Sequence, residues 1–188
     1  MGAFKPLLPF GDAVVAEACV RHLFEGGADG IVVVLGHRAA EMRKRLSHLP
    51  VSFAVNDLEE SEMSVSIARG VERVPAEAGA ILIALCDQPA IPPTVVRLLI
   101  DEWRRTGAPL LLPEFGGRGG HPVLIDSRFR QKLLKLDGKR GLRSLFDAHG
   151  EAVRRLPVAS PFVARDMDTW EDYVGLHREV FGTVPPDS

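Results

Sequence analysis

Apolar and polar positions follow two different periods along the chain. Short apolar runs, such as residues 30–35 and 80–85, are typical of strands that are buried on both faces. Between these runs, apolar residues recur every three or four positions, which indicates amphipathic helices. The expected strands are 30–35, 51–55, 80–85, 110–112, 123–125 and 153–156. The expected helices are 12–25, 38–49, 61–73, 92–105, 129–136, 142–149 and 169–180. This alternation predicts an α/β domain with a largely parallel sheet.

Capping residues set the expected ends of several elements. Asp12 is a good N-cap for the first helix, and Thr169 with Asp172 comes close to a capping box at the last. Pro6 and Pro9 predict an extended chain around Lys5. No repeat or long linker divides the sequence, so we expect one domain over residues 1–188 with a frayed tail at 182–188.

Composition narrows the class of protein. With 188 residues, 46% of them hydrophobic and 26% charged, the chain can bury the core of one soluble domain. A formal net charge of −2 argues against a nucleic-acid or anionic membrane partner. Two cysteines are too few for a disulfide scaffold, and no apolar run reaches the length of a membrane span, so we expect a cytoplasmic protein.

An acid directly after an apolar run is the strongest chemical signal. Asp87 follows residues 80–85, and ligands of open α/β sheets bind at the carboxyl ends of strands. A carboxylate at that place suits Mg²⁺, which prefers oxygen ligands and uses one or two carboxylates together with substrate phosphates. Asp87 is also a residue type that favours turns and helix caps for purely structural reasons.

A second acidic segment lies late in the chain. Asp166 and Asp168 are two residues apart, so in an extended segment both face the same side. Together with Asp87 they predict a divalent metal site assembled by the fold. Asp168 could instead stabilise the N-terminus of the helix that begins beside Thr169.

Other candidates for ligand contact are polar residues in loops and at helix starts. Lys5 could meet a phosphate, or be a solvated surface lysine. Arg118 and His121 lie in a glycine-rich loop at 114–122, which could approach an anionic substrate or form a simple hairpin. Ser64 and Ser66 could reach a base or phosphate, or serve as capping residues. The histidines have no spacing typical of metal ligands.

Five short motifs occur in a fixed order along the chain. They are Lys5-Pro6-Leu7-Leu8-Pro9, Asn56 with Glu62-Met63-Ser64-Val65-Ser66-Ile67, Asp87-Gln88-Pro89, Gly117-Arg118-Gly119-Gly120-His121-Pro122-Val123-Leu124, and Asp166-Met167-Asp168-Thr169-Trp170-Glu171-Asp172. Each motif is weak alone, but their order and spacing are specific. Over essentially the whole chain they resemble the MobA-like nucleotidyltransferases, and most closely the molybdenum cofactor cytidylyltransferases.

The resemblance implies a fold and a set of roles. The fold would be a Rossmann-like three-layer α/β/α sandwich with a mostly parallel mixed sheet, of the nucleotide-diphospho-sugar transferase type. Asp87 and Asp168 would hold Mg²⁺, and Lys5 would contact the triphosphate. The remaining implied contacts are Ser64, Ser66, Gln88 and Pro89 to the nucleotide, and Arg118, Gly119, Gly120 and His121 to the acceptor.

The sequence also departs from the family pattern. It begins after the family's first strand and its Gly-x-Ser-x-Arg loop, so either the start codon is assigned too late or the protein lacks part of its triphosphate site. Loss of a central strand would also expose sheet edges. Glu62 stands where the family has glycine, and Trp170 stands where it has proline.

Three functions remain open at this level. The leading hypothesis is Mg²⁺-dependent transfer of a nucleotidyl group from CTP to the phosphate of molybdopterin cofactor, with a molybdoenzyme or its chaperone as a further partner. The second is a related transferase that uses GTP or another nucleotide, or a sugar-phosphate or alcohol-phosphate acceptor. The third is a truncated, non-catalytic relative that binds cofactor or a partner.

Overall fold

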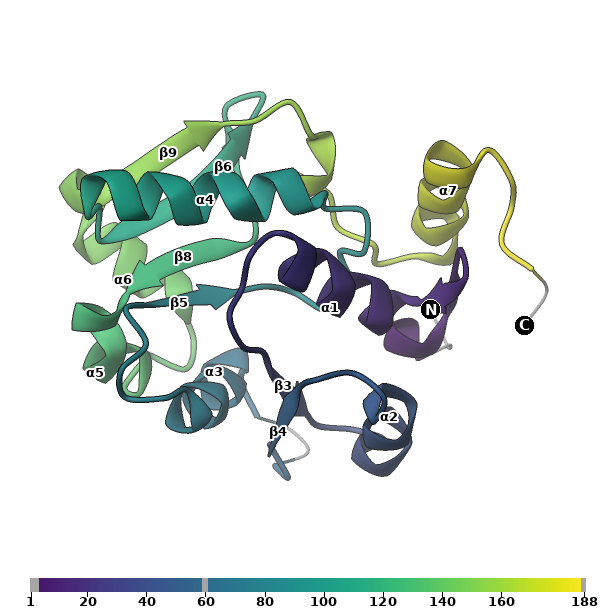
Figure 1. Ribbon diagram of the computed structural model, residues 1–188, viewed down its shortest axis with the longest axis horizontal. Helices are drawn as coiled ribbons and strands as arrows, with labels where there is room; N and C mark the ends of the chain where they lie inside the picture. Colours follow the sequence, from purple (N-terminus) through teal and green to yellow (C-terminus); the bar gives the residue numbers. More distant parts are fainter. Residues whose placement is uncertain (1–3, 59–60, 187–188) are drawn as a thin grey trace.

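The computed structural model describes residues 4–58 and 61–186 and has a mixed α/β architecture (Figure 1). The strands are β1 (Pro9–Phe10), β2 (Ala13–Val14), β3 (Val32–Leu35), β4 (Ser52–Val55), β5 (Ala80–Ile83), β6 (Leu110–Phe115), β7 (Arg118–Gly119), β8 (Val123–Asp126) and β9 (Val153–Pro157). The helices are α1 (Val15–Glu25), α2 (Ala39–Leu46), α3 (Met63–Arg73), α4 (Pro93–Thr106), α5 (Arg130–Leu133), α6 (Leu142–Ala148) and α7 (Trp170–Phe181). Short 3-10 helices are η1 (Lys5–Leu7), η2 (Ser127–Phe129), η3 (Gly150–Ala152) and η4 (Pro161–Ala164).

The main sheet is mixed. Its strand order is β5-β8-β6-β7, and β9 pairs with β6. Strand β8 runs antiparallel to both β5 and β6, whereas β9 runs parallel to β6. Strands β5, β6 and β9 therefore share one direction, and β8 is inserted between them in the opposite sense.

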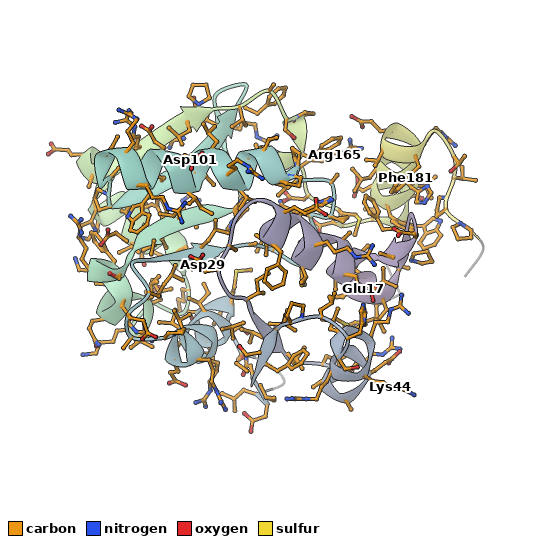
Figure 2. All side chains as sticks on the ribbon, viewed as in Figure 1. Glu17, Asp29, Lys44, Asp101, Arg165 and Phe181 are labelled. Atoms are coloured by element: carbon orange, nitrogen blue, oxygen red, sulfur yellow. The ribbon has the colours of Figure 1, made fainter. Side chains whose placement is uncertain are left out.

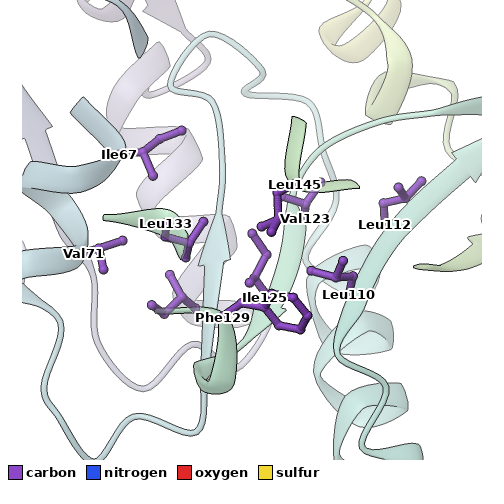
Figure 3. Packing of buried hydrophobic residues seen from close by; sticks show 10 residues of the cluster. Ile67, Val71, Leu110, Leu112, Val123, Ile125, Phe129, Leu133 and Leu145 are labelled. Carbon is purple, nitrogen blue, oxygen red and sulfur yellow. The ribbon is translucent and has the colours of Figure 1, made fainter. Parts of the chain in front are cut away.

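Alternation along these strands creates two apolar faces. Leu110, Val123 and Ile125 point to one face, where they pack with side chains of α3, α5 and α6 (Figure 3). Leu111 and Leu124 point to the other face, where α4 covers them (Figure 1). This two-residue period is the one expected of strands, and it yields the three-layer α/β/α arrangement predicted from the sequence.

Strands β3 and β4 form a separate parallel pair. Within residues 4–58 and 61–186, no strand pairing joins this pair to the main sheet, so β5 lies at one end of the main sheet and is not its central strand. Val32, Val33 and Val34 are consequently only half-buried, although their sequence is typical of a strand buried on both faces.

The N-terminal and C-terminal segments pack together. Leu8 and Phe10 join Val15 of α1 and Tyr173 and Leu176 of α7 in one buried cluster. Strands β1 and β2 form a small antiparallel hairpin that leads directly into α1. This cluster fixes the segment around Lys5 against the start of α7.

Several predicted ends differ from the structure. The first helix begins at Val15, and its N-cap is Val14, not Asp12, because residues 13–14 pair in the hairpin. Glu17, labelled in Figure 2, is the polar capping group: its Oε2 accepts a hydrogen bond from Val14 N at 3.0 Å. Lys5 lies on a short 3-10 helix and not in an extended segment, because Leu8 N donates to the Lys5 carbonyl and a proline is tolerated in the first turn.

The remaining elements follow the predictions with small shifts. The last helix has Thr169 as N-cap with the reciprocal Asp172 bond, as predicted. The glycine-rich loop forms the turn of a β6–β7 hairpin, with positive φ at Gly116 and Gly117, a conformation that suits two-residue hairpin turns. No helix among the described residues is both long and apolar enough to cross a membrane. Residues 1–3, and residues 187–188 of the predicted tail, lie outside the described residues.

Candidate active site

Three charged residues from distant parts of the chain meet at one place. Lys5 Nζ lies 2.8 Å from Asp168 Oδ1 and 4.0 Å from Asp87 Oδ2. Lys5 is on η1, Asp87 lies in the turn after β5, and Asp168 precedes α7. The fold therefore brings together the three residues that the sequence indicated as members of the active site. The Lys5 ammonium lies beside both carboxylates.

The segment that carries Asp168 is fixed on both sides. Met167 is 2% exposed and belongs to the cluster between the N-terminal segment and α7, whereas Asp166 and Asp168 are exposed. The two acids therefore lie on the same side of the segment, as their spacing predicted. Downstream, Asp172 Oδ2 accepts hydrogen bonds from Asp168 N at 3.2 Å and from Thr169 N at 2.8 Å.

Tyr173 fixes the segment that carries Lys5. Its side chain is fully buried, and its hydroxyl donates to the Pro9 carbonyl at 2.6 Å. The sequence analysis did not identify Tyr173, although it is the only tyrosine of the chain and lies on the apolar face of a predicted helix. A periodicity analysis places such a residue in the core but cannot name the carbonyl that it holds.

Burial and charge oppose each other at Asp87. Burial raises the pKa of the Asp87 carboxyl above its usual value, although the Lys5 ammonium acts in the opposite direction. The Asp166 and Asp168 carboxylates raise this pKa further. A partly buried carboxylate beside two other carboxylates is stabilised by a nearby cation. Carboxyl groups with a perturbed pKa of this kind are common at functional sites.

Neither cysteine is a candidate nucleophile. Although Cys86 is exposed at the surface, desolvation of its sulfur, with a contribution from the Asp87 carboxylate, raises the pKa of the thiol to about 11. Burial likewise raises the pKa of Cys19. Both thiols are therefore protonated near neutral pH, and the thiolate is the reactive form.

The glycine-rich hairpin is attached to the segment that leads to Asp168. Gly120 packs so closely on η4 that a Cβ atom at this position would lie 1.8 Å from the Val163 carbonyl oxygen. Next to it, His121 N donates to the same oxygen at 2.9 Å. The hairpin can therefore position groups beside the carboxylates, which is consistent with its expected role toward the acceptor.

His121 faces the end of β5. Its Nδ1 lies 3.4 Å from the Ile83 carbonyl oxygen. Burial lowers the pKa of His121, against the opposing effects of the Ile83 carbonyl and the Asp87 and Asp166 carboxylates. The imidazole is therefore neutral at pH 7 and available as a hydrogen-bonding group.

The other two hairpin residues differ in their surroundings. Arg118 is exposed on β7. Gly119 lies against Leu112 and Arg155, and a Cβ atom there would come within 2.7 Å of Leu112 Cδ1. Its lack of a side chain thus serves packing within the hairpin.

Gln88 and Pro89 are buried in the turn behind Asp87. The Gln88 side chain is 7% exposed, and its Nε2 donates to the Arg165 carbonyl at 3.3 Å. Arg165, labelled in Figure 2, lies near α7 and forms an ion pair with Glu179 of that helix. The Gln88 amide is therefore buried and bonded to the backbone at Arg165.

Ser64 and Ser66 lie at the start of α3. Asn56 Nδ2 donates to Ser66 Oγ at 2.9 Å and to Ser61 Oγ at 2.6 Å. Ser64 is buried beside Gly138. No hydrogen bond or ion pair among the described residues connects these serines to Lys5, Asp87 or Asp168, so their expected contact with a nucleotide stays a prediction.

The donor set suits a divalent cation that substrate helps to bind. Residues 4–58 and 61–186 contain no group of three or more His, Cys, Asp or Glu side chains arranged around a metal position. Asp87 and Asp168 both approach the Lys5 ammonium, so these two carboxylates are the residues that would hold a divalent cation together with oxygen ligands from outside the protein.

Solved structures similar to this chain include nucleotidyltransferases. Rv0371c from Mycobacterium tuberculosis H37Rv, solved in complex with manganese, is 28% identical, with a TM-score of 0.81 over 94% of this chain and 93% of that chain. A nucleotidyl transferase from Methanothermobacter thermautotrophicus, Mth528, is 26% identical, with a TM-score of 0.82 over 94% and 85%. CMP:2-keto-3-deoxy-manno-octonic acid synthetase, solved with CTP, is 12% identical with a TM-score of 0.74 over 94% and 91%, a likeness of fold alone.

The sequence comparison agrees with this likeness. No curated protein matches the chain. Residues 1–153 match the family described as the MobA-like NTP transferase domain. On this match the chain belongs to the MobA-like NTP transferase domain family.

Proposed function

We propose that this protein transfers a nucleotidyl group from a nucleoside triphosphate to the phosphate of an acceptor such as molybdopterin cofactor. CTP is the nucleotide that we expect it to use. The observation that carries the proposal is the position of Lys5 between Asp87 and Asp168. Family membership supports nucleotidyl transfer in general, and the motifs around Lys5, Asp87 and Asp168 favour the cytidylyltransferase branch.

The bond changes of this reaction need no strong general base. A phosphate oxygen of the acceptor attacks the α-phosphorus of the triphosphate, and the bond from that phosphorus to the bridging oxygen of the leaving pyrophosphate breaks. A phosphate monoester has a second pKa of about 6, so the attacking group is mostly ionised at neutral pH. The site of carboxylates, lysine and a neutral histidine is consistent with such chemistry.

Each residue then has a positioning or electrostatic role. The Lys5 ammonium would bind phosphate oxygens of the triphosphate as a point charge. Asp87 and Asp168 would hold a divalent cation, and Mg²⁺ is the expected ion. When bound, that cation would neutralise charge that develops on the phosphates during transfer.

The acceptor would approach from the β6–β7 hairpin. Gly120 and His121 join this hairpin to the segment before Asp168, so an acceptor bound there would lie beside the carboxylates. Arg118, which is exposed on β7, would bind the acceptor phosphate. A molybdoenzyme or its chaperone would be the partner that receives the product.

Calorimetry with CTP, GTP, ATP and UTP, with and without Mg²⁺, tests the nucleotide. We expect CTP to bind in a Mg²⁺-dependent manner and more tightly than the other three nucleotides. Release of pyrophosphate after addition of molybdopterin cofactor then tests the acceptor. Preference for GTP, or release of pyrophosphate only with a sugar-phosphate, would replace the substrates proposed here, and no binding of any nucleotide would contradict an enzymatic role.

A further inference from the structure

Gln88 is turned away from the charged site, although it directly follows Asp87. Its side chain is buried, and its amide nitrogen donates to the Arg165 carbonyl across the gap between the end of β5 and the segment at 165–168. The orientation of the amide is determined by this contact, because only the NH₂ group can face a carbonyl oxygen.

The other end of the same amide lies at a small cavity. Gln88 Oε1 is buried and has no hydrogen-bond donor among the described residues. The cavity is about 10 Å³ and is lined by Asp87, Gln88, Arg165 and Asp166 together with the apolar side chains Ala90, Phe162, Met167 and Leu176. Because Oε1 has no donor in the described part of the chain, the hydrogen bond from Nε2 to the Arg165 carbonyl is the contact that holds the Gln88 amide in place.

We propose that Gln88 is a positioning residue, which holds the 165–168 segment against the turn after β5 and thereby sets the distance between the Asp87 and Asp168 carboxylates. This inference rests on the proposed function, because the binding of a divalent cation by Asp87 and Asp168 is part of that proposal. It replaces the role toward the nucleotide that the resemblance suggested for Gln88.

The neighbouring contacts explain why such a residue is needed. Asp168 is fixed from the downstream side by the capping bonds of α7, and its own side chain is 71% exposed. Arg165 contacts α7 through its side chain and Gln88 through its carbonyl. Gln88 is therefore a direct link between the strand end that carries Asp87 and the segment that carries Asp168.

Replacement by methionine tests the proposal, because methionine has a similar length and makes no such hydrogen bond. For Gln88→Met we expect the affinity for Mn²⁺, measured by calorimetry without substrate, to fall about 10-fold, in the range that second-layer partners of metal ligands show. We expect kcat to fall by a similar factor, while KM for the nucleotide stays within about twofold. Gln131→Met, an exposed position on α5, is the matched control and should change none of these values.

A second variant guards against loss of packing. Gln88→Leu fills the site with an apolar side chain of similar volume, adds no charge and makes no hydrogen bond to the Arg165 carbonyl, so it should weaken Mn²⁺ binding as methionine does. Two results would overturn the proposal: unchanged Mn²⁺ affinity in both variants, or a raised KM for the nucleotide with unchanged kcat and Mn²⁺ affinity, which indicates direct nucleotide contact. If the wild type lacks transferase activity, the proposed function fails, and the Mn²⁺ affinities of wild type and variants still decide the role of Gln88.

Discussion

Asp87 carries a negative charge where the fold disfavours it. Burial raises its pKa above the ordinary value, so ionisation of this carboxyl costs more in the folded state than in the unfolded state and lowers the stability of the folded state as pH rises. Asp87→Asn removes this charge and keeps the shape. We expect transfer activity to fall about 100-fold or more, because the variant loses a cation ligand, while the free energy of unfolding at pH 7 stays equal or rises.

Two measurements check this prediction together. Pyrophosphate release reports activity, and denaturant unfolding reports stability. Asp29→Asn, at an exposed position labelled in Figure 2, is the control and should change neither. An active Asp87→Asn variant would contradict the role of Asp87 as a metal ligand.

Asp126 has the opposite electrostatic character. Burial opposes its ionisation, but hydrogen bonds from Arg128 and from Trp103 Nε1 outweigh burial and hold the pKa of Asp126 below its usual value. A lowered folded-state pKa gives a stabilisation that is complete above the ordinary Asp pKa of about 3.9 and is lost as pH falls through the lower value. We expect Asp126→Asn to lower the free energy of unfolding by about 1–2 kcal/mol at pH 7.

Unfolding curves at several pH values test the sign. The difference between wild type and Asp126→Asn should shrink as pH falls below about 4, because the wild-type carboxyl becomes protonated there. Asp101→Asn, at an exposed position on α4, should show no such convergence (Figure 2). A difference that grows with acid would contradict the assignment.

At the level of elements, the β6–β7 hairpin depends on the absence of a side chain at Gly120. A Cβ atom there would lie 2.3 Å from the Val163 carbonyl carbon as well as 1.8 Å from its oxygen, and backbone cannot give way as a flexible side chain does. We expect Gly120→Ala to lower the free energy of unfolding by at least about 2 kcal/mol. The hairpin would also separate from η4, so activity should fall even where the variant remains folded.

Thermal unfolding and the transfer assay measure the two effects of Gly120→Ala. Gly30→Ala is the matched control, because a Cβ atom at Gly30 has no heavy atom within 4 Å and φ is not left-handed there. Equal stability of the two variants would show that the close approach of the hairpin to η4 does not exist in solution.

Most elements could be predicted from periodicity, and the exceptions have local causes. The sequence predicts that the first helix begins at Asp12, because Asp is a common N-cap, whereas the structure uses Glu17 from inside the helix and leaves Asp12 in the hairpin turn. Strand β6 continues to Phe115 because it pairs with β7 and β9, which the sequence does not reveal. The start of the first helix and the end of β6 therefore depend on strand pairing, which periodicity along the sequence does not show.

At the scale of the whole molecule, the site exists only because distant segments meet. Lys5 and Asp168 are 163 positions apart, and the residue types and motif order predicted them as members of one site. The contacts that hold them together could not be predicted, since Tyr173 and the Arg165 carbonyl have no sequence signal for their partners. The division between the β3–β4 pair and the main sheet is likewise a property of the assembled fold.

Tyr173→Phe tests how far this assembly depends on one buried hydrogen bond. The variant keeps the aromatic ring in the cluster with Leu8 and Phe10 but leaves the Pro9 carbonyl without the hydroxyl. We expect the free energy of unfolding to fall by about 1 kcal/mol. Since η1 lies directly before Pro9, the amide hydrogens of Leu7 and Leu8, which close its turns, should exchange faster, and kcat/KM should fall several-fold because Lys5 is held less firmly. Unchanged exchange at both amides, measured by NMR, would mean that apolar packing alone holds Lys5 beside Asp168.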